Sequence, residues 1–199
     1  GAVMLDVRHQ KEFAKRHVPR SIFIGLNGSF APWVGALIKD VAQPILLIAE
    51  EDELEEGVTR LSRVGFDNVV GYLEGGLNNW VASGRQTDHV DSVPPTDLEK
   101  VLANHPNTFV ADVRKESEYL SEHINGAENV PLSTLNKHLD KLPEEETFYV
   151  HCAGGYRSMI ASSILKSRGV HNIVDVAGGF KAIKESSIPV SDFVCPTTL

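Results

Sequence analysis

The feature that most constrains the fold of this chain is an internal repeat. The segment VMLDVRHQKEFAKRHV at residues 3–18 aligns with FVADVRKESEYLSEHI at residues 109–124. Identical or similar residues match at one constant spacing: Asp6-Val7-Arg8 with Asp112-Val113-Arg114, Glu12-Phe13 with Glu118-Tyr119, and His17 with His123. The segments GFDNVVGYLEGGLNNW at 65–80 and GVHNIVDVAGGFKAI at 169–183 form a second matching pair. Ordered matches at a domain-sized period indicate two copies of one folding unit.

Short apolar runs alternate with amphipathic segments in each copy. The runs TFVADV, TFYVHC and NIVDV are short and rich in Val, Ile and Phe, as buried strands are. The segment SMIASSILKSRG has apolar residues at helical spacing and ends at Gly169, which suits a helix C-cap. The pattern predicts an α/β fold of two tandem domains, each a mainly parallel sheet flanked by helices.

The domain boundaries follow from composition. The stretch SGRQTDHVDSVPPT at 83–96 is polar, aperiodic and contains Pro94-Pro95, which is typical of a linker. We predict a first domain over residues 1–86, a linker over 87–96, a second domain over 97–190 and a tail over 191–199. A helix is expected from Asp97 to near Asn104, and it has no counterpart before Gly1. The first copy is therefore expected to be clipped at its N-terminus, with further chain upstream.

Composition excludes several classes of protein. The net charge of −8 over 199 residues argues against a nucleic-acid partner or an anionic membrane surface. No apolar run has the length of a membrane span, no signal-peptide pattern opens the chain, and no metal-site motif is present. Two cysteines, Cys152 and Cys195, do not make a disulfide scaffold. These features predict a protein of a reducing compartment, the cytoplasm.

The segment VHCAGGYRS at 150–158 carries the chemistry. Cys152 ends a predicted strand of a parallel sheet, where active sites form, and a helix follows. Gly154 and Gly155 allow a compact loop whose backbone N–H groups turn toward the sulfur, and the helix presents its positive end there. Both effects favour the thiolate. A lone cysteine after a strand is more commonly a small buried apolar residue, but the glycines, Arg157 and the helix start favour a nucleophile here.

The length of this loop bears on whether the thiolate attacks phosphorus or sulfur. Cysteine phosphatases use the pattern H-C-x5-R-[ST], whereas His151-Cys152 is followed by four residues and then Arg157-Ser158. A shorter ring encloses less space and suits one additional sulfur atom, as in a persulfide, better than a phosphate. The sequence leaves two orientations open for Arg157, toward a bound anion or bracing the loop. His151 is interpreted as a strand-end residue rather than a base.

Together the repeated D-V-R…E-F/Y…H motif, the six-residue cysteine loop and the Gly-Gly pair before the last helix resemble the rhodanese family of sulfurtransferases. The resemblance covers nearly the whole chain as two tandem domains. The first copy is similar to the first of two rhodanese domains that follow a metallo-β-lactamase-fold domain in bacterial fusion proteins. In that family the upstream domain is a non-haem iron persulfide dioxygenase. The resemblance implies no cofactor in this segment and an iron only in an upstream domain.

The resemblance implies roles for the residues of the second copy. Cys152 is the catalytic nucleophile, which carries sulfur from thiosulfate or glutathione persulfide to a thiol, sulfite or cyanide. Asp112 and Arg114 support the loop as an ion pair. The remaining loop residues bind the persulfide: Ala153, Gly154, Gly155, Tyr156, Arg157 and Ser158.

The first copy has the acidic run AEEDELEEG at 49–57 where the loop would be, so it is expected to be inactive. The repeated Glu118, Tyr119 and His123 are interpreted as packing or capping groups, and Cys195 as an incidental tail residue. Two other functions remain open. One is a non-catalytic persulfide carrier or interaction module, and the other is a cysteine phosphatase or arsenate reductase, which the loop length disfavours.

Overall fold

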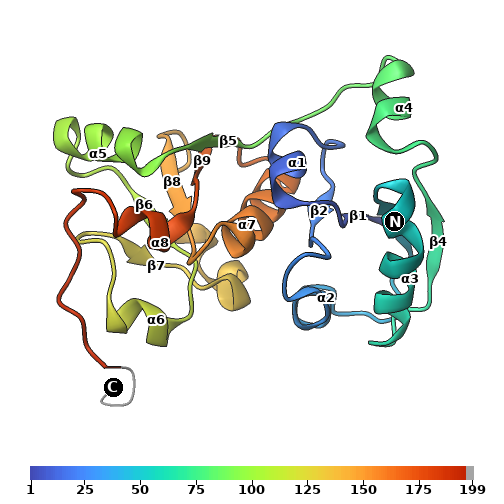
Figure 1. Cartoon of the computed structure of the whole chain (residues 1–199), viewed down its shortest axis with the longest axis horizontal. Coiled ribbons are helices and arrows are strands. Elements are labelled where there is room, and N and C mark those ends of the chain that lie inside the picture. Colours follow the sequence, from blue (N-terminus) through green and yellow to red (C-terminus); the bar gives the residue numbers. More distant parts are fainter. Residues whose placement is uncertain (196–199) are drawn as a thin grey trace. The chain divides into compact units, whose positions relative to one another are not determined.

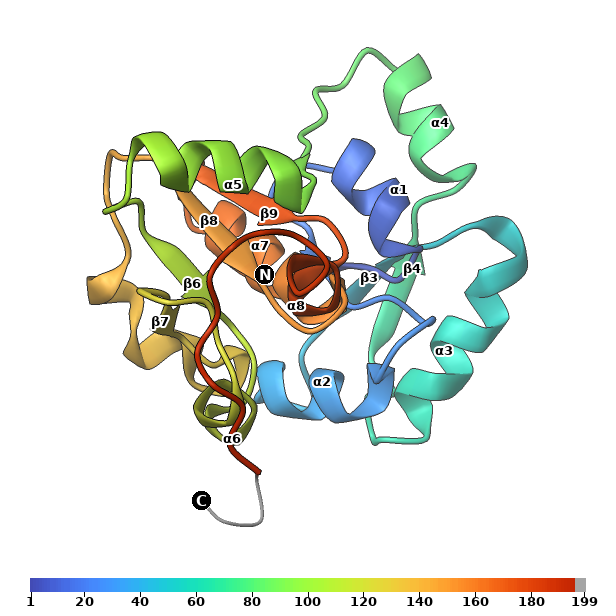
Figure 2. The same ribbon diagram turned by 60° about the vertical axis from the view of Figure 1, so that its left-hand side comes forward.

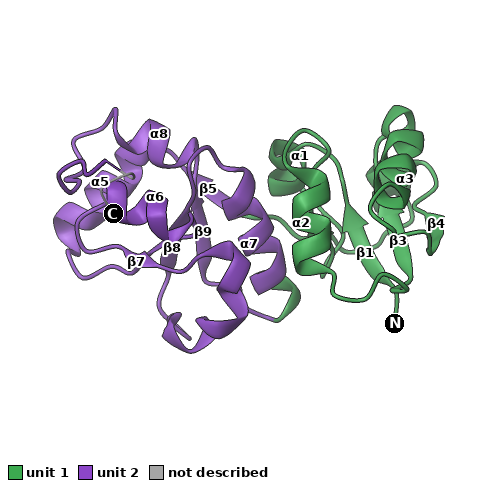
Figure 3. Ribbon diagram, turned by 90° about the horizontal axis from the view of Figure 1, so that it is seen from below, with its two compact units in different colours: residues 1–90, 166–168 green, residues 91–165, 169–199 purple. Residues whose placement is uncertain are grey.

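The computed structural model describes residues 1–195 and divides the chain into two compact units (Figures 1 and 3). Unit 1 comprises residues 1–90 together with 166–168, and unit 2 comprises residues 91–165 and the chain from residue 169 onward. Each unit has its own sheet, in which every strand pair is parallel. The predicted α/β fold with two parallel sheets flanked by helices is confirmed.

The sheet of unit 1 has four strands in the order β2-β1-β3-β4. The strands are β1 (Val3–Asp6), β2 (Ile22–Phe23), β3 (Ile45–Ile48) and β4 (Val69–Tyr72). The helices are α1 (Gln10–Lys15), α2 (Phe30–Leu37), the short 3₁₀ turn η1 (Glu51–Glu53), α3 (Leu54–Ser62) and α4 (Gly76–Ala82). The strand β3 is entirely apolar, as expected for a strand covered on both faces.

The sheet of unit 2 has five strands in the order β5-β9-β8-β6-β7. The strands are β5 (Asp91–Val93), β6 (Val110–Asp112), β7 (Glu128–Asn129), β8 (Phe148–His151) and β9 (Ile173–Val176). The helical segments are α5 (Pro95–Asn104), α6 (Glu116–Ser121), the 3₁₀ segments η2 (Leu132–Lys137) and η3 (Leu139–Lys141), α7 (Tyr156–Ser167) and α8 (Gly179–Ile183). In Figures 2 and 3, α8 and α7 lie on opposite sides of this sheet.

Strand register shows which residues of the two units correspond. Asp6 on β1 pairs with Ile48 on β3, and the repeated Asp112 on β6 pairs with His151 on β8. Ile48 therefore corresponds to His151, and the next residue, Ala49, corresponds to Cys152. The repeat seen in the sequence is thus a repeat of the fold, with the cysteine present in unit 2 and replaced by alanine in unit 1.

The structure differs from the sequence interpretation at the linker predicted for residues 87–96. Asp91–Val93 form β5, which pairs with β9 at the edge of the unit 2 sheet. A three-residue strand that begins Asp-Ser has no alternating apolar pattern from which it could be predicted. The helix α5 begins at Pro95 rather than Asp97, because proline is well suited to the first turn of a helix. It ends at Asn104, as expected.

The segment predicted as a tail is partly attached to unit 2. The Ser191 backbone N–H donates to the His123 carbonyl at 2.8 Å, and the Val194 N–H donates to the Ser121 carbonyl at 2.8 Å. The Ser121 hydroxyl in turn donates to the Val194 carbonyl at 2.7 Å. Residues 196–199 of the predicted tail lie outside the described residues. None of the helices within residues 1–195 has the length and apolar content needed to cross a membrane.

Candidate active site

Cys152 lies in the loop between β8 and α7, at the C-terminal edge of the unit 2 sheet. The residue is 1% exposed, and its sulfur accepts a hydrogen bond from the Gly155 backbone N–H at 3.1 Å. Gly155 has a φ of +98°, a left-handed conformation that a residue with a side chain rarely adopts. The backbone therefore turns a donor toward the sulfur, and such a donor stabilises a thiolate.

The start of α8 holds this loop from the other side. The Phe180 N–H donates to the Cys152 carbonyl at 2.6 Å, and the Lys181 N–H donates to the Ala153 carbonyl at 3.1 Å. Gly179 has a φ of +58°, and a methyl group added there would clash with the Cys152 carbonyl oxygen and lie 2.9 Å from the Gly154 nitrogen. A glycine is needed at residue 179 because two backbones approach each other closely here.

The predicted loop residues are brought together by their position in the chain. Gly155 and Ser158 are buried, Ala153, Tyr156 and Arg157 are half-buried, and Gly154 is exposed. The Ser158 hydroxyl donates to the Gly155 carbonyl at 3.2 Å, so the first turn of α7 also anchors the left-handed glycine.

Arg157 braces the loop. Its two terminal nitrogens donate to the Glu118 carboxylate of α6 at 2.6 Å and 2.8 Å, a bidentate pair. The guanidinium lowers the pKa of Glu118, and Glu118 raises the pKa of Arg157. Glu118 also accepts the Lys115 backbone N–H at 3.1 Å, which fixes the carboxylate at the start of α6. The orientation that the sequence left open is toward Glu118.

Asp112 and Arg114 form a buried pair at the end of β6. Arg114 Nε lies 2.9 Å from both Asp112 oxygens, and Arg114 Nη2 lies 2.6 Å from Asp112 Oδ2. Arg114 Nη2 also donates to the Glu122 carbonyl at 2.7 Å, and its guanidinium lies 3.9 Å from the centre of the Phe180 ring. The pair therefore supports the loop through Phe180, the residue whose backbone N–H binds Cys152.

His151, the residue that precedes Cys152, is fully buried. Burial lowers the pKa of its imidazole, although the Asp112 carboxylate lies 3.8 Å from Nε2. Its ring lies 6.0 Å from that of Phe180 in a stacked arrangement. A buried histidine stacked on an aromatic ring agrees with its interpretation as a strand-end residue.

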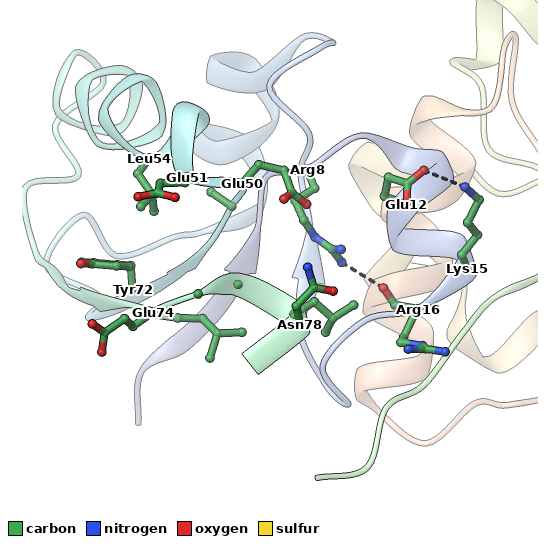
Figure 4. Close-up of a pocket in the computed structure, with 15 residues that line it drawn as sticks. Arg8, Glu12, Lys15, Arg16, Glu50, Glu51, Leu54, Tyr72, Glu74 and Asn78 are labelled. Atoms are coloured by element: carbon green, nitrogen blue, oxygen red, sulfur yellow. Dashed lines mark hydrogen bonds and ion pairs between the residues drawn. The ribbon is translucent and has the colours of Figure 1, made fainter. Parts of the chain in front are cut away.

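The corresponding edge of unit 1 is an open pocket of about 690 Å³ without a cysteine (Figure 4). Ala49 stands in the place of Cys152, and the acidic residues that follow it extend into η1. Leu54, counted from Ala49, takes the place of Arg157. The charged groups around the pocket have both signs: Arg8, Lys15, Arg16, Glu12, Glu50, Glu51 and Glu74. Across residues 1–195 no group of three or more histidine, cysteine, aspartate or glutamate side chains is arranged to hold a metal ion.

Two residues outside the loop make contacts that the sequence did not indicate. The repeat predicts only a packing or capping role for Glu118, yet its carboxylate also binds Arg157. Its match to Glu12 concealed this, because unit 1 has Leu54, which cannot bind a carboxylate, in the place of Arg157. Asp175, at the end of β9, is 3% exposed, and the Ser92 hydroxyl of β5 donates to it at 3.2 Å. Asp175 carried no sequence signal, because its neighbours come from distant segments.

A family model for the Rhodanese-like domain matches residues 1–83 and 94–186. The chain belongs to the rhodanese-like domain family. The first match lies within unit 1, and the second lies within the second copy of the repeat. Unit 1 is therefore a rhodanese-like domain that has alanine in place of the loop cysteine.

Several proteins are similar to this rhodanese-like chain. An uncharacterized protein of Synechocystis sp. is 34% identical over 111 residues, which cover 55% of this chain and 59% of that protein. The putative sulfur carrier protein YrkF of Bacillus subtilis is 28% identical over 98 residues, 48% of this chain and 53% of that protein. The thiosulfate sulfurtransferase GlpE of Coxiella burnetii is 30% identical over 91 residues, 46% of this chain and 84% of that protein. The chain thus spans little more than half the length of the first two relatives.

A solved structure of a thiosulfate sulfurtransferase from Pseudomonas aeruginosa is similar over 97% of this chain and 41% of that chain, with 20% identity and a TM-score of 0.48.

Proposed function

We propose that this protein is a sulfurtransferase that carries sulfane sulfur on Cys152. The observation that supports the proposal most directly is the Gly155 N–H aimed at the Cys152 sulfur in a glycine loop at the C-terminal edge of a parallel sheet. A backbone donor of this kind stabilises negative charge on the sulfur without an adjacent base. The same donor can stabilise the outer sulfur of a persulfide, which is also anionic.

The proposed first step is attack of the Cys152 thiolate on the outer sulfur of thiosulfate. The bond between the two sulfur atoms of thiosulfate breaks, a Cys–S–S⁻ persulfide forms, and sulfite leaves with the electron pair of the broken bond. Glutathione persulfide is the second proposed donor, with glutathione thiolate as its leaving group. A thiol, sulfite or cyanide then attacks the outer sulfur of the persulfide and restores the Cys152 thiolate.

The environment of Arg157 favours sulfur over phosphate. A phosphatase loop needs its arginine free to bind two oxygens of the phosphate, but both terminal nitrogens of Arg157 bind Glu118. The loop is also one residue shorter than the phosphatase pattern. These two features disfavour a phosphatase or arsenate reductase activity relative to sulfur transfer.

The test is the intact mass of the protein after incubation with thiosulfate or glutathione persulfide. We expect a gain of about 32 Da, one sulfur atom, that is lost on addition of cyanide and is absent from Cys152→Ser. The control is a check that the Cys152 thiol itself, and not only the exposed Cys195, can be alkylated in the wild-type protein. A thiol that is alkylated but never gains sulfur would contradict the proposal.

A sulfur carrier that passes the persulfide only to a partner protein is the second candidate. It is favoured by the similarity to the putative sulfur carrier protein YrkF. Repeated turnover distinguishes the two, because a sulfurtransferase releases thiocyanate from thiosulfate and cyanide many times per protein. A carrier would instead lose its sulfur to a protein acceptor and turn over slowly with small acceptors.

We further propose that the protein acts in the cytoplasm beside a metallo-β-lactamase-fold persulfide dioxygenase domain. The support is the resemblance of the unit 1 segments to the rhodanese domain that follows such a domain. Any non-haem iron would belong to that domain, and unit 1 would carry no sulfur chemistry of its own. Oxygen uptake with glutathione persulfide tests this, because the protein that contains such a domain should consume oxygen. Absence of uptake by the iron-loaded protein would contradict it.

A further inference from the structure

Lys181 lies beside the Cys152 loop, in the first turn of α8. Its backbone N–H donates to the Ala153 carbonyl at 3.1 Å, and the preceding Phe180 N–H donates to the Cys152 carbonyl at 2.6 Å. The side chain of Lys181 is exposed, and its ammonium group has no ion-pair or hydrogen-bond partner among residues 1–195. The backbone therefore fixes a lysine next to the loop that carries the reactive sulfur, with its charge available to an anion.

The two arginines around the loop are already neutralised. Arg157 binds the Glu118 carboxylate at 2.6 Å and 2.8 Å, and Arg114 lies 2.6 Å from the buried Asp112. An anionic sulfur donor is repelled by the thiolate that must attack it, so a cation close to the thiolate favours binding of the donor. Lys181 can supply this charge without the loss of an existing ion pair.

The corresponding residue of unit 1 shows which way the position of Lys181 faces. The two-glycine turn before the last helix matches in the two units, so Asn78 is the counterpart of Lys181. Asn78 lines the open pocket of unit 1 together with Ala49, the counterpart of Cys152 (Figure 4). Since the fold is repeated, Lys181 belongs to the edge of the unit 2 sheet at which the cysteine lies.

Three glutamates that line the unit 1 pocket have small uncharged counterparts in unit 2. The glutamates are Glu50, Glu51 and Glu74. Their counterparts are Ala153, Gly154 and Ala177. Unit 2 thus lacks three negative charges at the edge that carries the cysteine, and it has a positive charge at Lys181 where unit 1 has an amide. Both differences make this edge more attractive to an anion.

A second lysine, Lys115, is exposed at the start of α6. Its counterpart in the repeat is His9. The described residues that line the unit 1 pocket include Asn78 but not His9. The comparison of the two units therefore assigns Lys181, and not Lys115, to the edge with the cysteine, and Lys115 provides a matched control.

We propose that Lys181 binds the anionic group of the sulfur donor and so favours donors with a charged oxyanion group, such as thiosulfate, over neutral ones. The ammonium pairs with the sulfonate oxygens while the Cys152 thiolate attacks the outer sulfur. The bond between the two sulfur atoms breaks, and its electron pair leaves with sulfite, whose charge Lys181 partly balances. This inference rests on the proposed sulfurtransferase function.

The first test compares the second-order rate of persulfide formation from thiosulfate in three variants. Glutamine resembles lysine in helix propensity but has no charge. Lys181→Gln should therefore lower the rate about fivefold to tenfold at low ionic strength, and the difference from wild type should shrink in high salt. Lys181→Arg, which keeps the charge, should retain most of the rate. Lys115→Gln should leave it unchanged.

The second test needs no sulfur transfer. In a Cys195→Ser background, Cys152 is alkylated with iodoacetate, which is anionic, and with iodoacetamide, which is neutral. Lys181→Gln should lower the ratio of the iodoacetate rate to the iodoacetamide rate about threefold, because it removes the charge that attracts the anionic reagent. The neutral reagent controls for any change in the thiol or in access to the loop. Lys115→Gln should leave the ratio unchanged.

The inference is overturned if Lys181→Gln leaves the alkylation ratio unchanged, or if Lys115→Gln lowers the ratio as much. A wild-type protein that gains no sulfur, but whose alkylation ratio depends on Lys181, would contradict the sulfurtransferase proposal and support the anion site. Failure of the one proposal is therefore distinguishable from failure of the other.

Discussion

The two units share one structural frame and differ in the loop that the frame presents. In unit 1, Arg8 binds Asp6 and donates to the Arg16 carbonyl at 3.0 Å, and in unit 2, Arg114 binds Asp112 and donates to the Glu122 carbonyl at 2.7 Å. The histidines His17 and His123 stack on the aromatic ring four residues earlier, both at 3.9 Å. These repeated contacts belong to the fold, because unit 1 keeps them without a cysteine.

The residues that differ are those that touch the sulfur or the loop around it. Unit 2 has a compact glycine loop clamped by α6 and α8, whereas unit 1 has an acidic turn around an open pocket (Figure 4). The comparison teaches that residues shared by the two units build the edge of the sheet, while residues present in one unit define what that edge can do. Each of the following predictions uses one unit as the control for the other.

The largest expected effect is the loss of either buried arginine. Arg8→Ala and Arg114→Ala each leave an aspartate buried without its partner, and each should lower the free energy of unfolding of its own unit by about 3–5 kcal/mol. Both tryptophans, Trp33 and Trp80, lie in unit 1. Tryptophan fluorescence in urea therefore follows unit 1 alone, while circular dichroism follows both units. If Arg8→Ala lowered the free energy of unfolding much less than Arg114→Ala, the buried pair would not have the same structural role in the two units.

An intermediate effect is expected at the glycine that begins the last helix of each unit. Gly76 and Gly179 have φ values of +59° and +58°, so alanine is strained at both, by about 1–2 kcal/mol. A Cβ at residue 76 would lie an ordinary 3.6 Å from the Ala49 carbonyl, whereas one at residue 179 would displace the Cys152 loop. Gly179→Ala should therefore lower the rate of persulfide formation by about 100-fold, because small misplacements of reacting groups have such effects.

The matched variant Gly76→Ala should leave the rate of persulfide formation unchanged and affect only the stability of unit 1. Equal rates for the two alanine variants, measured by intact mass against time, would show that the contact between α8 and the loop does not matter for reactivity.

The smallest effect is expected at Glu118. Its sequence match in unit 1 is Glu12, but the two carboxylates bind different partners. Glu118→Gln removes the charge that holds Arg157. A partly exposed ion pair of this kind contributes up to about 1 kcal/mol of stabilisation. The rate of sulfur transfer should therefore fall about threefold to fivefold. Arg157 lowers the pKa of Glu118, so the pair is intact above the ordinary carboxyl range and is lost as the pH falls through the folded value.

In the wild-type protein, the rate of sulfur transfer should fall at low pH as Glu118 is protonated. This fall should be absent from Glu118→Gln. The corresponding Glu12 pairs with the exposed Lys15, and Glu12→Gln should change neither the rate nor its pH dependence. An unchanged profile in Glu118→Gln would show that Arg157 does not need its partner.

Much of the fold could be predicted because the repeat and the apolar runs are local signals. The short runs around Val110 and Val150 are strands, and the segment after the cysteine is a helix. The strand β5 could not be predicted, because Asp91 and Ser92 gain their place only through pairing with β9. A strand whose pairing partner lies far along the chain and whose residues are polar leaves no periodic pattern.

The site was predictable to the extent that it is contiguous. The residues from Cys152 to Ser158 are close because they are consecutive, and the repeat marked Asp112 and Arg114. Glu118 reaches Arg157 of the loop from α6, and this contact depends on how α6 and α7 are placed against the sheet. One signal was available for Glu118: an acidic residue present in both copies gains a new partner where one copy alone carries an arginine.

The strand β5 also decides where this protein can be cut. A fragment that began at residue 97, as the composition of the linker suggests, would strip the outermost strand from the second sheet. Its loss would leave β9 with a row of unpaired backbone groups, an edge prone to aggregation. It would also remove Ser92 from Asp175. A fragment meant to isolate the cysteine domain should therefore begin no later than Asp91, the first residue of that strand.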